Sequence, residues 1–220
     1  MIVTIDGPAG SGKSTVAQLL AKRLDASYLD TGAMYRAVTL AALQLGVDMT
    51  DELQLLQVLD KTDFKFRMRE GKIFVAINGL DVTERIRERE VTANARYAAS
   101  AEKIRARLVQ MQRNFALGQD KIVTEGRDQG TVAFDDADFK FFLKAEETER
   151  ARRRMLELQE KGVEVTLEQV QKDIENRDKS DRNRNVGPLK PADDAKIIDT
   201  TDMSVEEVVV KLLSYIEEDE

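Results

Sequence analysis

Short apolar runs recur along the chain and are separated by stretches with helical spacing. The runs cover residues 2–6, 27–29, 121–125, 139–143 and 196–199, and their length is typical of buried parallel strands. After the first run the period changes, because Val16, Leu20 and Leu24 recur every four residues, as on one face of a helix. The pattern predicts an α/β fold in which a five-stranded parallel sheet is wrapped by helices on both faces.

Further helices are predicted over residues 32–45, 50–60, 146–160 and 166–178. Gly46 is expected to close the first of these helices, and either Thr50 or Asp51 to cap the second. Near the C-terminus, Ser204 is followed three residues later by Glu207, which predicts a capping box for a terminal helix.

One segment breaks the alternation of strands and helices. Apolar residues alternate with polar ones over 64–68 and again over 73–77, with Gly71 between them, which predicts an antiparallel hairpin. We interpret this hairpin as part of an inserted subdomain. Ser100 is then expected to cap a helix that ends at Gly118. The apolar face of that helix consists of Ile104, Leu108, Met111 and Phe115.

Composition narrows the possible functions. The chain has 220 residues, 42% of them hydrophobic, which suits one globular core. Its formal net charge of −7 argues against nucleic-acid binding, which depends on neutralising phosphates. It contains no cysteine and no histidine, so thiolate chemistry is excluded and any general base must be a carboxylate. We find neither a membrane-spanning stretch nor a signal peptide, and therefore expect a soluble cytoplasmic protein.

Residues 7 to 15, GPAGSGKST, match the pattern of a phosphate-binding loop between a strand and a helix. Gly7, Gly10 and Gly12 allow the backbone N–H groups to wrap an anion at a helix N-terminus. Lys13 can reach the terminal phosphates of a nucleotide, and the Ser14 hydroxyl can ligate Mg²⁺. The alternative is a glycine-rich turn without a ligand. We predict ATP binding by Gly7, Pro8, Ala9, Gly10, Ser11, Gly12, Lys13, Ser14 and Thr15.

Polar side chains follow two other predicted strands. LDTGAMYR supplies Thr31 and Arg36, and EGRDQGT supplies Glu125, Arg127 and Asp128. Because ligands of a parallel sheet bind beyond the carboxyl ends of its strands, we expect these groups to share one crevice. Glu125 ends a buried strand, where it could hold a Mg²⁺-bound water. The competing interpretation of Arg127 and Asp128 is a local ion pair of little consequence.

Two charged segments remain. RARRR, residues 150–154, is typical of a solvated helix face, paired here with Glu146, Glu147 and Glu149. RDKSDRNR, residues 177–184, is either a polar loop or a set of mobile arginines that close over a nucleotide and exclude water.

Together GPAGSGKST, LDTGAMYRA, EGRDQGT, RRMLELQEKG and RDKSDRNR resemble the bacterial cytidylate kinase family along the whole chain. The resemblance implies a nucleoside-monophosphate kinase fold, of the type found in P-loop NTPases. It implies a core of residues 1–57, 100–145 and 179–220, a monophosphate-binding insert of 58–99 and a helical lid of 146–178. The implied activity, in pyrimidine nucleotide metabolism, is transfer of the γ-phosphoryl group of ATP to CMP or dCMP, with Mg²⁺. We expect a monomer whose partners are ATP, CMP and dCMP, with no nucleic acid and no membrane.

The resemblance also assigns roles to individual positions. Arg36 and Arg127 would bind the acceptor phosphate; Thr31, Arg105 and Asp128 would surround the cytosine; Arg177 and Asp181 would face the pentose; and Arg184 would belong with the phosphates. Lys13, Arg127 and Arg184 would be the catalytic residues, with Ser14 on the metal and Glu125 reaching it through water. The chain departs from the family at Thr31, where serine is usual, and at Arg96, where a small hydroxyl residue approaches the sugar.

The chemistry of the base agrees with this assignment. A carboxylate such as Asp128 accepts from the cytosine amino group, and a guanidinium such as Arg105 donates to the ring acceptors. Uracil would set an acceptor against that carboxylate. Other hypotheses stay open: another small-molecule P-loop kinase, such as one that accepts UMP, or a non-catalytic nucleotide-binding switch. The absence of an N-K-x-D motif counts against a GTPase-type switch.

Overall fold

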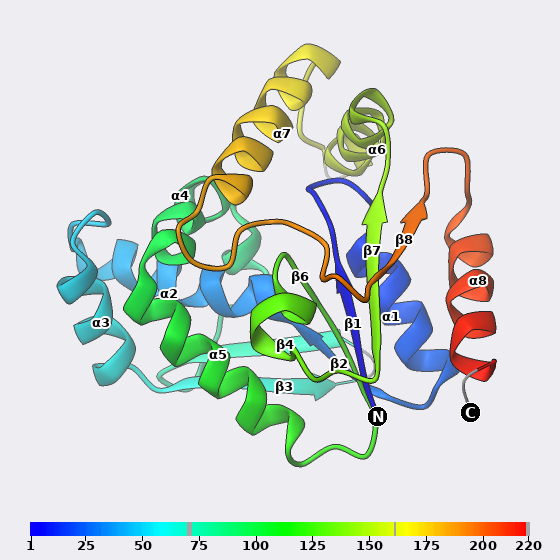
Figure 1. Ribbon diagram of the computed structural model, residues 1–220. Coiled ribbons are helices and arrows are strands. Elements are labelled where there is room, and N and C mark those ends of the chain that lie inside the picture. The colour runs from blue at the N-terminus through cyan, green and yellow to red at the C-terminus, as the bar shows by residue number, and fades with distance from the viewer. Residues whose placement is uncertain (70–71, 161, 219–220) are drawn as a thin grey trace.

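A five-stranded parallel sheet forms the centre of the computed structural model, which describes residues 1–69, 72–160 and 162–218. Its strands, in the order β2-β6-β1-β7-β8, are β2 (Ser27–Asp30), β6 (Ile122–Gly126), β1 (Ile2–Asp6), β7 (Phe139–Lys144) and β8 (Lys196–Asp199). Neighbouring strands are parallel throughout, with Thr4 opposite Thr124 and Lys140. The predicted sheet is thereby confirmed (Figure 1).

Helices cover both faces of this sheet. α1 (Lys13–Arg23) and α8 (Val205–Glu217) pack on one face, where Leu20 and Leu212 meet Val3 and Phe141 in a buried cluster. The predicted capping box of α8 is present, because Ser204 and Glu207 bond each other's backbone N–H groups. Across the described residues, no helix combines the length and the apolar character needed to cross a membrane.

The other face carries a larger set of helices, α2 (Thr31–Leu45), α3 (Glu52–Lys61), α4 (Arg89–Ser100) and α5 (Glu102–Ala116). α2 ends at Gly46 in the left-handed region, with φ 64°, as predicted. Asp51, and not Thr50, caps α3 by accepting from the N–H groups of Leu53 and Gln54. A short 3₁₀ turn, Arg85–Arg87, precedes α4.

Two boundaries on this face were predicted wrongly. α4 was not anticipated, and Ser100 is its last residue instead of a cap for the next helix. α5 starts after Ala101, which offers no side-chain oxygen, and its capping position at the end is Leu117 instead of Gly118. The buried side chains of α4 are Val91 and Ala98, which are smaller than the Ile104 and Leu108 that α5 buries, so spacing alone did not separate the two helices.

The predicted hairpin is confirmed as β3 (Phe64–Arg69) and β4 (Lys72–Ile77), with Phe66 opposite Val75. A third strand of two residues, β5 (Leu80–Asp81), completes this antiparallel sheet and was not predicted. The turn expected at Gly71 lies outside the described residues.

Two helices, α6 (Glu147–Glu160) and α7 (Leu167–Arg182), pack on each other beyond the carboxyl end of the sheet (Figure 1). α7 is capped by Thr166 and Gln169 and runs four residues further than the predicted end at 178. Arg177 and Asp181 therefore lie on a helix, and the interpretation of 177–184 as a loop is wrong for most of its length.

Candidate active site

The loop between β1 and α1 has the geometry of an anion cradle. Gly7, Gly10 and Gly12 all have positive φ, 151°, 75° and 85°, which L-residues rarely adopt. A Cβ on Gly7 would collide with the Leu143 carbonyl, so the loop approaches β7 too closely for a side chain. α1 begins at Lys13, directly after the loop, and its free N–H groups and dipole point toward the enclosed space.

Lys13 folds over this loop and is 5% exposed. Its Nζ donates to the Pro8 carbonyl at 2.6 Å and to Ser11 Oγ at 3.3 Å. Burial, followed by the nearby charge of Arg127, lowers the pKa of Lys13 to about 7, although Glu125 opposes the shift. An anion held in the cradle would favour the charged form of this lysine.

Ser14 and Glu125 bring together the oxygens predicted for the metal. Ser14 Oγ donates to Glu125 Oε1 at 2.7 Å, and Glu125 is 5% exposed at the end of β6. Within the described ranges, no group of three or more His, Cys, Asp or Glu side chains could hold a metal alone. A hydroxyl beside one carboxylate nevertheless fits Mg²⁺, which keeps several waters and takes its other ligands from phosphates.

Asp30 organises the positive charge next to β2. It caps α2 through the Ala33 N–H and pairs with Arg36 at 2.9 Å and with Arg87 at 3.4 Å. Thr31 lies beside it, and its Oγ1 donates to the Glu125 carbonyl at 2.8 Å. Burial raises the pKa of Asp30, but the two arginines outweigh that effect and lower it. Arg87 was missed from the sequence because no strand-end motif surrounds it.

Arg105 and Asp128 form an ion pair, and both residues are almost fully buried. Arg105 also donates to the Ala99 carbonyl at 3.0 Å and lies 5.5 Å above the Tyr35 ring. Burial lowers the pKa of Arg105, yet Tyr35 and Asp128 raise it by more. The competing interpretation of Arg127 and Asp128 as a local ion pair is wrong, because Arg127 pairs with Asp181 at 2.8 Å instead.

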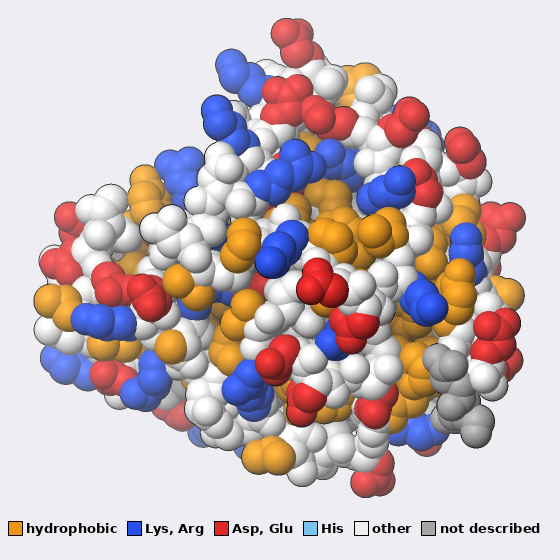
Figure 2. Space-filling view, viewed as in Figure 1, with side chains coloured by type: hydrophobic (Ala, Val, Ile, Leu, Met, Phe, Trp, Pro, Cys, Tyr) orange, Lys and Arg blue, Asp and Glu red, His pale blue; other side chains and the backbone are white. Residues whose placement is uncertain are grey.

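Asp181 gathers arginines from two elements. Besides Arg127, it lies 3.9 Å from Arg184, whose Nε donates to the Asp181 carbonyl at 3.3 Å. Arg177, one turn earlier on α7, adds further positive charge. Burial raises the pKa of Asp181, but the charges of Arg127, Arg184 and Arg177 lower it more strongly. Three guanidinium groups around one carboxylate leave net positive charge, and Figure 2 shows Lys and Arg gathered near α6 and α7.

Several buried N–H groups of these arginines and of neighbouring side chains have no acceptor. Across the described residues, the buried side-chain atoms without a hydrogen-bond partner are Arg36 Nε, Arg105 Nε, Gln112 Nε2, Arg184 Nη2 and Thr131 Oγ1. The nitrogens are donors, and buried donors are costly to leave unpaired. A ligand rich in acceptor oxygens and ring nitrogens would satisfy them. Gln112 was not anticipated, because it lies mid-helix with no motif around it.

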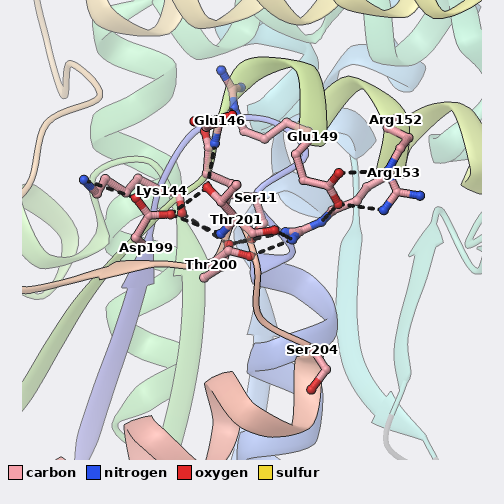
Figure 3. Close-up of polar contacts among 12 residues, drawn as sticks. Ser11, Lys144, Glu146, Glu149, Arg152, Arg153, Asp199, Thr200, Thr201 and Ser204 are labelled. Atoms are coloured by element: carbon pink, nitrogen blue, oxygen red, sulfur yellow. Dashed lines mark hydrogen bonds and ion pairs between the residues drawn. The ribbon is translucent and has the colours of Figure 1, made fainter.

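The interpretation of RARRR, residues 150–154, as a solvated helix face is correct only in part. Arg152 pairs with Glu149 at 2.8 Å and is exposed. Arg153 also bonds Glu149, but it reaches the Thr200 and Thr201 carbonyls at 2.6 and 2.9 Å, tying α6 to the β8–α8 loop (Figure 3). Arg150 is buried, so for that residue the prediction is wrong. Arg96 is exposed and donates to the Tyr97 hydroxyl at 3.1 Å.

The phosphate loop and the buried arginines lie together at the carboxyl edge of the parallel sheet. This is the arrangement of a P-loop kinase. The shikimate kinase of Bacteroides thetaiotaomicron has this fold too, with a TM-score of 0.52, 13% identity and coverage of 99% of this chain and 98% of that one.

Closer relatives identify the family. Residues 3–218 match the family model of cytidylate kinase. Cytidylate kinase 1 of Haemophilus influenzae is 43% identical over 217 residues, 99% of this chain and 94% of that protein. The cytidylate kinase of Photorhabdus laumondii is 46% identical over 214 residues, 97% of this chain and 94% of that protein. The chain belongs to the cytidylate kinase family and is a phosphotransferase.

Proposed function

We propose that the protein phosphorylates CMP and dCMP with ATP. The observation that carries the proposal is the Arg105–Asp128 pair, because it places a charged donor and a charged acceptor side by side with both side chains almost fully buried. Cytosine presents the complementary set, an amino donor beside ring acceptors. The curated relatives that match nearly the whole chain are named cytidylate kinases, which supports the same substrate.

ATP would lie on the glycine cradle, with its phosphates against the loop of residues 7–15. Lys13 would leave the Pro8 carbonyl and bind the terminal phosphates, where its charge offsets that of the migrating group. Ser14 would ligate Mg²⁺, and Glu125 would hold one of its waters. Bound Mg²⁺ would neutralise phosphate charge as the phosphoryl group is transferred.

The acceptor would bind across the cleft. Arg36 and Arg127 would hold its phosphate, and Arg177 and Asp181 would face its sugar. Thr31, Arg105 and Asp128 would surround its base. Arg184 would stabilise charge during transfer, together with Lys13 and Arg127. A nucleotide phosphate is already a nucleophile at neutral pH, so a chain without histidine needs only positioning and charge stabilisation.

α6 and α7 would act as the lid, excluding water that would otherwise take the phosphoryl group. The division into core, insert and lid stays a prediction, as do the monomeric state, the cytoplasmic location and the absence of nucleic-acid or membrane partners.

The proposal is tested by measuring ADP release from ATP with each nucleoside monophosphate supplied singly. We expect stimulation by CMP and dCMP and little by UMP, AMP or GMP. Equal or better turnover with UMP would favour another small-molecule kinase. Slow hydrolysis that no acceptor stimulates would favour a nucleotide-binding switch.

A further inference from the structure

An ion pair outside the cleft joins the two helices beyond the sheet. Arg150 on α6 and Asp178 on α7 lie 2.6 Å apart, with side chains 5% and 4% exposed. Asp178 is buried on α7 together with Val170 and Ile174. None of the roles proposed above uses either residue.

Both residues of this ion pair also hydrogen-bond to the backbone of one residue of the phosphate loop. Asp178 Oδ1 accepts from the Ala9 N–H at 3.1 Å, and Arg150 Nη1 donates to the Ala9 carbonyl at 2.8 Å. Arg150 Nε donates to the Ala145 carbonyl at 3.1 Å, which anchors the guanidinium at the start of α6. The two polar backbone groups of Ala9 are therefore held by two helices that follow it by more than a hundred residues.

The packing around this contact is tight. The Ala9 side chain lies in a cluster with Ala151, Val170 and Ile174. A Cβ on Gly10 would come within 2.8 Å of the Arg150 carbonyl. Gly10 is therefore needed for close approach to α6 as well as for its positive φ, and α6 contacts the loop directly.

Stability alone does not account for this arrangement. A buried ion pair gains little over well-packed apolar side chains, because both charges lose their hydration. A glycine-rich loop, by contrast, has much backbone freedom to lose when it closes on phosphates. Fixing Ala9 before the ligand arrives would reduce that loss, and pre-organised sites bind more tightly for this reason.

We propose that Arg150 and Asp178 are positioning residues for ATP, which hold the phosphate loop in its binding conformation and couple it to α6 and α7. The inference rests on the proposed ATP site. Because the pair contacts the loop and not the acceptor side of the cleft, its loss weakens ATP binding and leaves CMP binding unchanged.

The test compares Arg150→Met, Asp178→Asn and the double variant with the wild type. ATP affinity is measured by calorimetry without acceptor, and KM is measured for ATP and for CMP. We expect the Kd and KM for ATP to rise about 10- to 100-fold, as misplaced binding groups do. The KM for CMP should stay within about twofold of the wild-type value. The Kd for ATP of the double variant should be no higher than that of the single variant that binds ATP less tightly, because the two residues act as one unit.

Leu158→Ala is the matched control, since Leu158 packs in the same interface between α6 and α7 without bonding the loop. It should lower the Tm and leave the Kd for ATP unchanged. The proposal is overturned if folded Arg150→Met lowers only the Tm, or if Leu158→Ala weakens ATP binding equally. If Arg150→Met does not fold, Asp178→Asn decides by the same measurements. If the wild-type protein binds ATP but CMP does not stimulate ADP release, the proposed function is overturned instead.

Discussion

Arg127 and Asp181 form an ion pair between the end of β6 and the last turn of α7, with Arg127 Nε 2.8 Å from Asp181 Oδ2. The two side chains are 16% and 13% exposed, so the contact is shielded from solvent but not fully buried. It links the arginine expected at the acceptor phosphate to the carboxylate expected at the sugar. Movement of α7 therefore affects both groups together.

Asp181→Ala should lower kcat/KM for CMP by about 10- to 100-fold, because a hydrogen bond to a charged group contributes roughly 1.5–3 kcal/mol. A larger loss for CMP than for dCMP would assign the contact to the 2′-hydroxyl, and equal losses would assign it to the 3′-hydroxyl. Arg182→Ala is the control, since Arg182 is exposed on the same turn of α7. If folded Asp181→Ala keeps the wild-type kcat/KM for both CMP and dCMP, Asp181 is not part of the substrate site.

The strands and the phosphate loop could be predicted because their determinants are local. Ile2, Val3 and Ile5 mark a buried strand, and the loop that follows needs glycine where its backbone has positive φ. The strand ends could then be assembled into one crevice, because parallel strands place their carboxyl ends at one edge. That rule brought Arg36, Glu125 and Arg127 to the cleft.

The site residues and the helix end that were not predicted depend on partners that are distant in sequence. Arg150 looks like its neighbours in RARRR, and only the fold sets it against Asp178 and Ala9. Arg87 and Gln112 gain their place from the packing of the 3₁₀ turn and of α5 beside the cleft. Asp181 was expected on a loop because charged residues dominate 177–184, but α7 continues to Arg182, where Asp181 pairs with Arg127 from the end of β6.

Lys13→Ala should lower kcat by about 10²–10³ while the fold survives, because it removes one positive charge from the transferring phosphates. The Nζ bonds to Pro8 and Ser11 are local, so the change in Tm should be small. Lys22→Ala, on the exposed side of the same helix, should retain wild-type activity. Near-full activity of the Lys13 variant would exclude the loop from catalysis.

Arg36→Ala should raise the KM for CMP by at least about 10-fold, the effect of losing one charged hydrogen bond. ATP affinity measured without acceptor should be unchanged. Arg87→Ala separates this from a structural effect, because Arg87 pairs with the same Asp30 but is 41% exposed. Equal losses in both variants would assign the effect to Asp30, and weakened ATP binding in Arg36→Ala would place that residue elsewhere.

Glu149 should make stability depend on acid pH. Its hydrogen bonds with Arg152, and then with Arg153, lower its pKa to about 2. A lowered carboxyl pKa contributes stability above the unfolded value near 4.5, and this contribution is lost as the pH falls toward 2. Glu149→Gln should therefore unfold at lower urea concentration than the wild type at pH 7, and the difference should shrink at pH 3. A constant difference would assign the effect to packing around Arg153, which Figure 3 shows directed at Thr200 and Thr201.

Asp128→Asn should change the choice between cytosine and uracil. The carboxylate can only accept, which suits the cytosine amino group, whereas an amide can also donate to the uracil carbonyl. We expect the ratio of kcat/KM for CMP over UMP to fall at least about 10-fold, because one charged hydrogen bond is lost and one repulsive contact is relieved. The Tm should fall too, since Arg105 would stay buried without its counter-charge. Asp136→Asn, an exposed change of the same chemistry, controls for net charge. A ratio that stays at the wild-type value in folded Asp128→Asn, with CMP turnover intact, would show that Asp128 holds Arg105 but does not read the base.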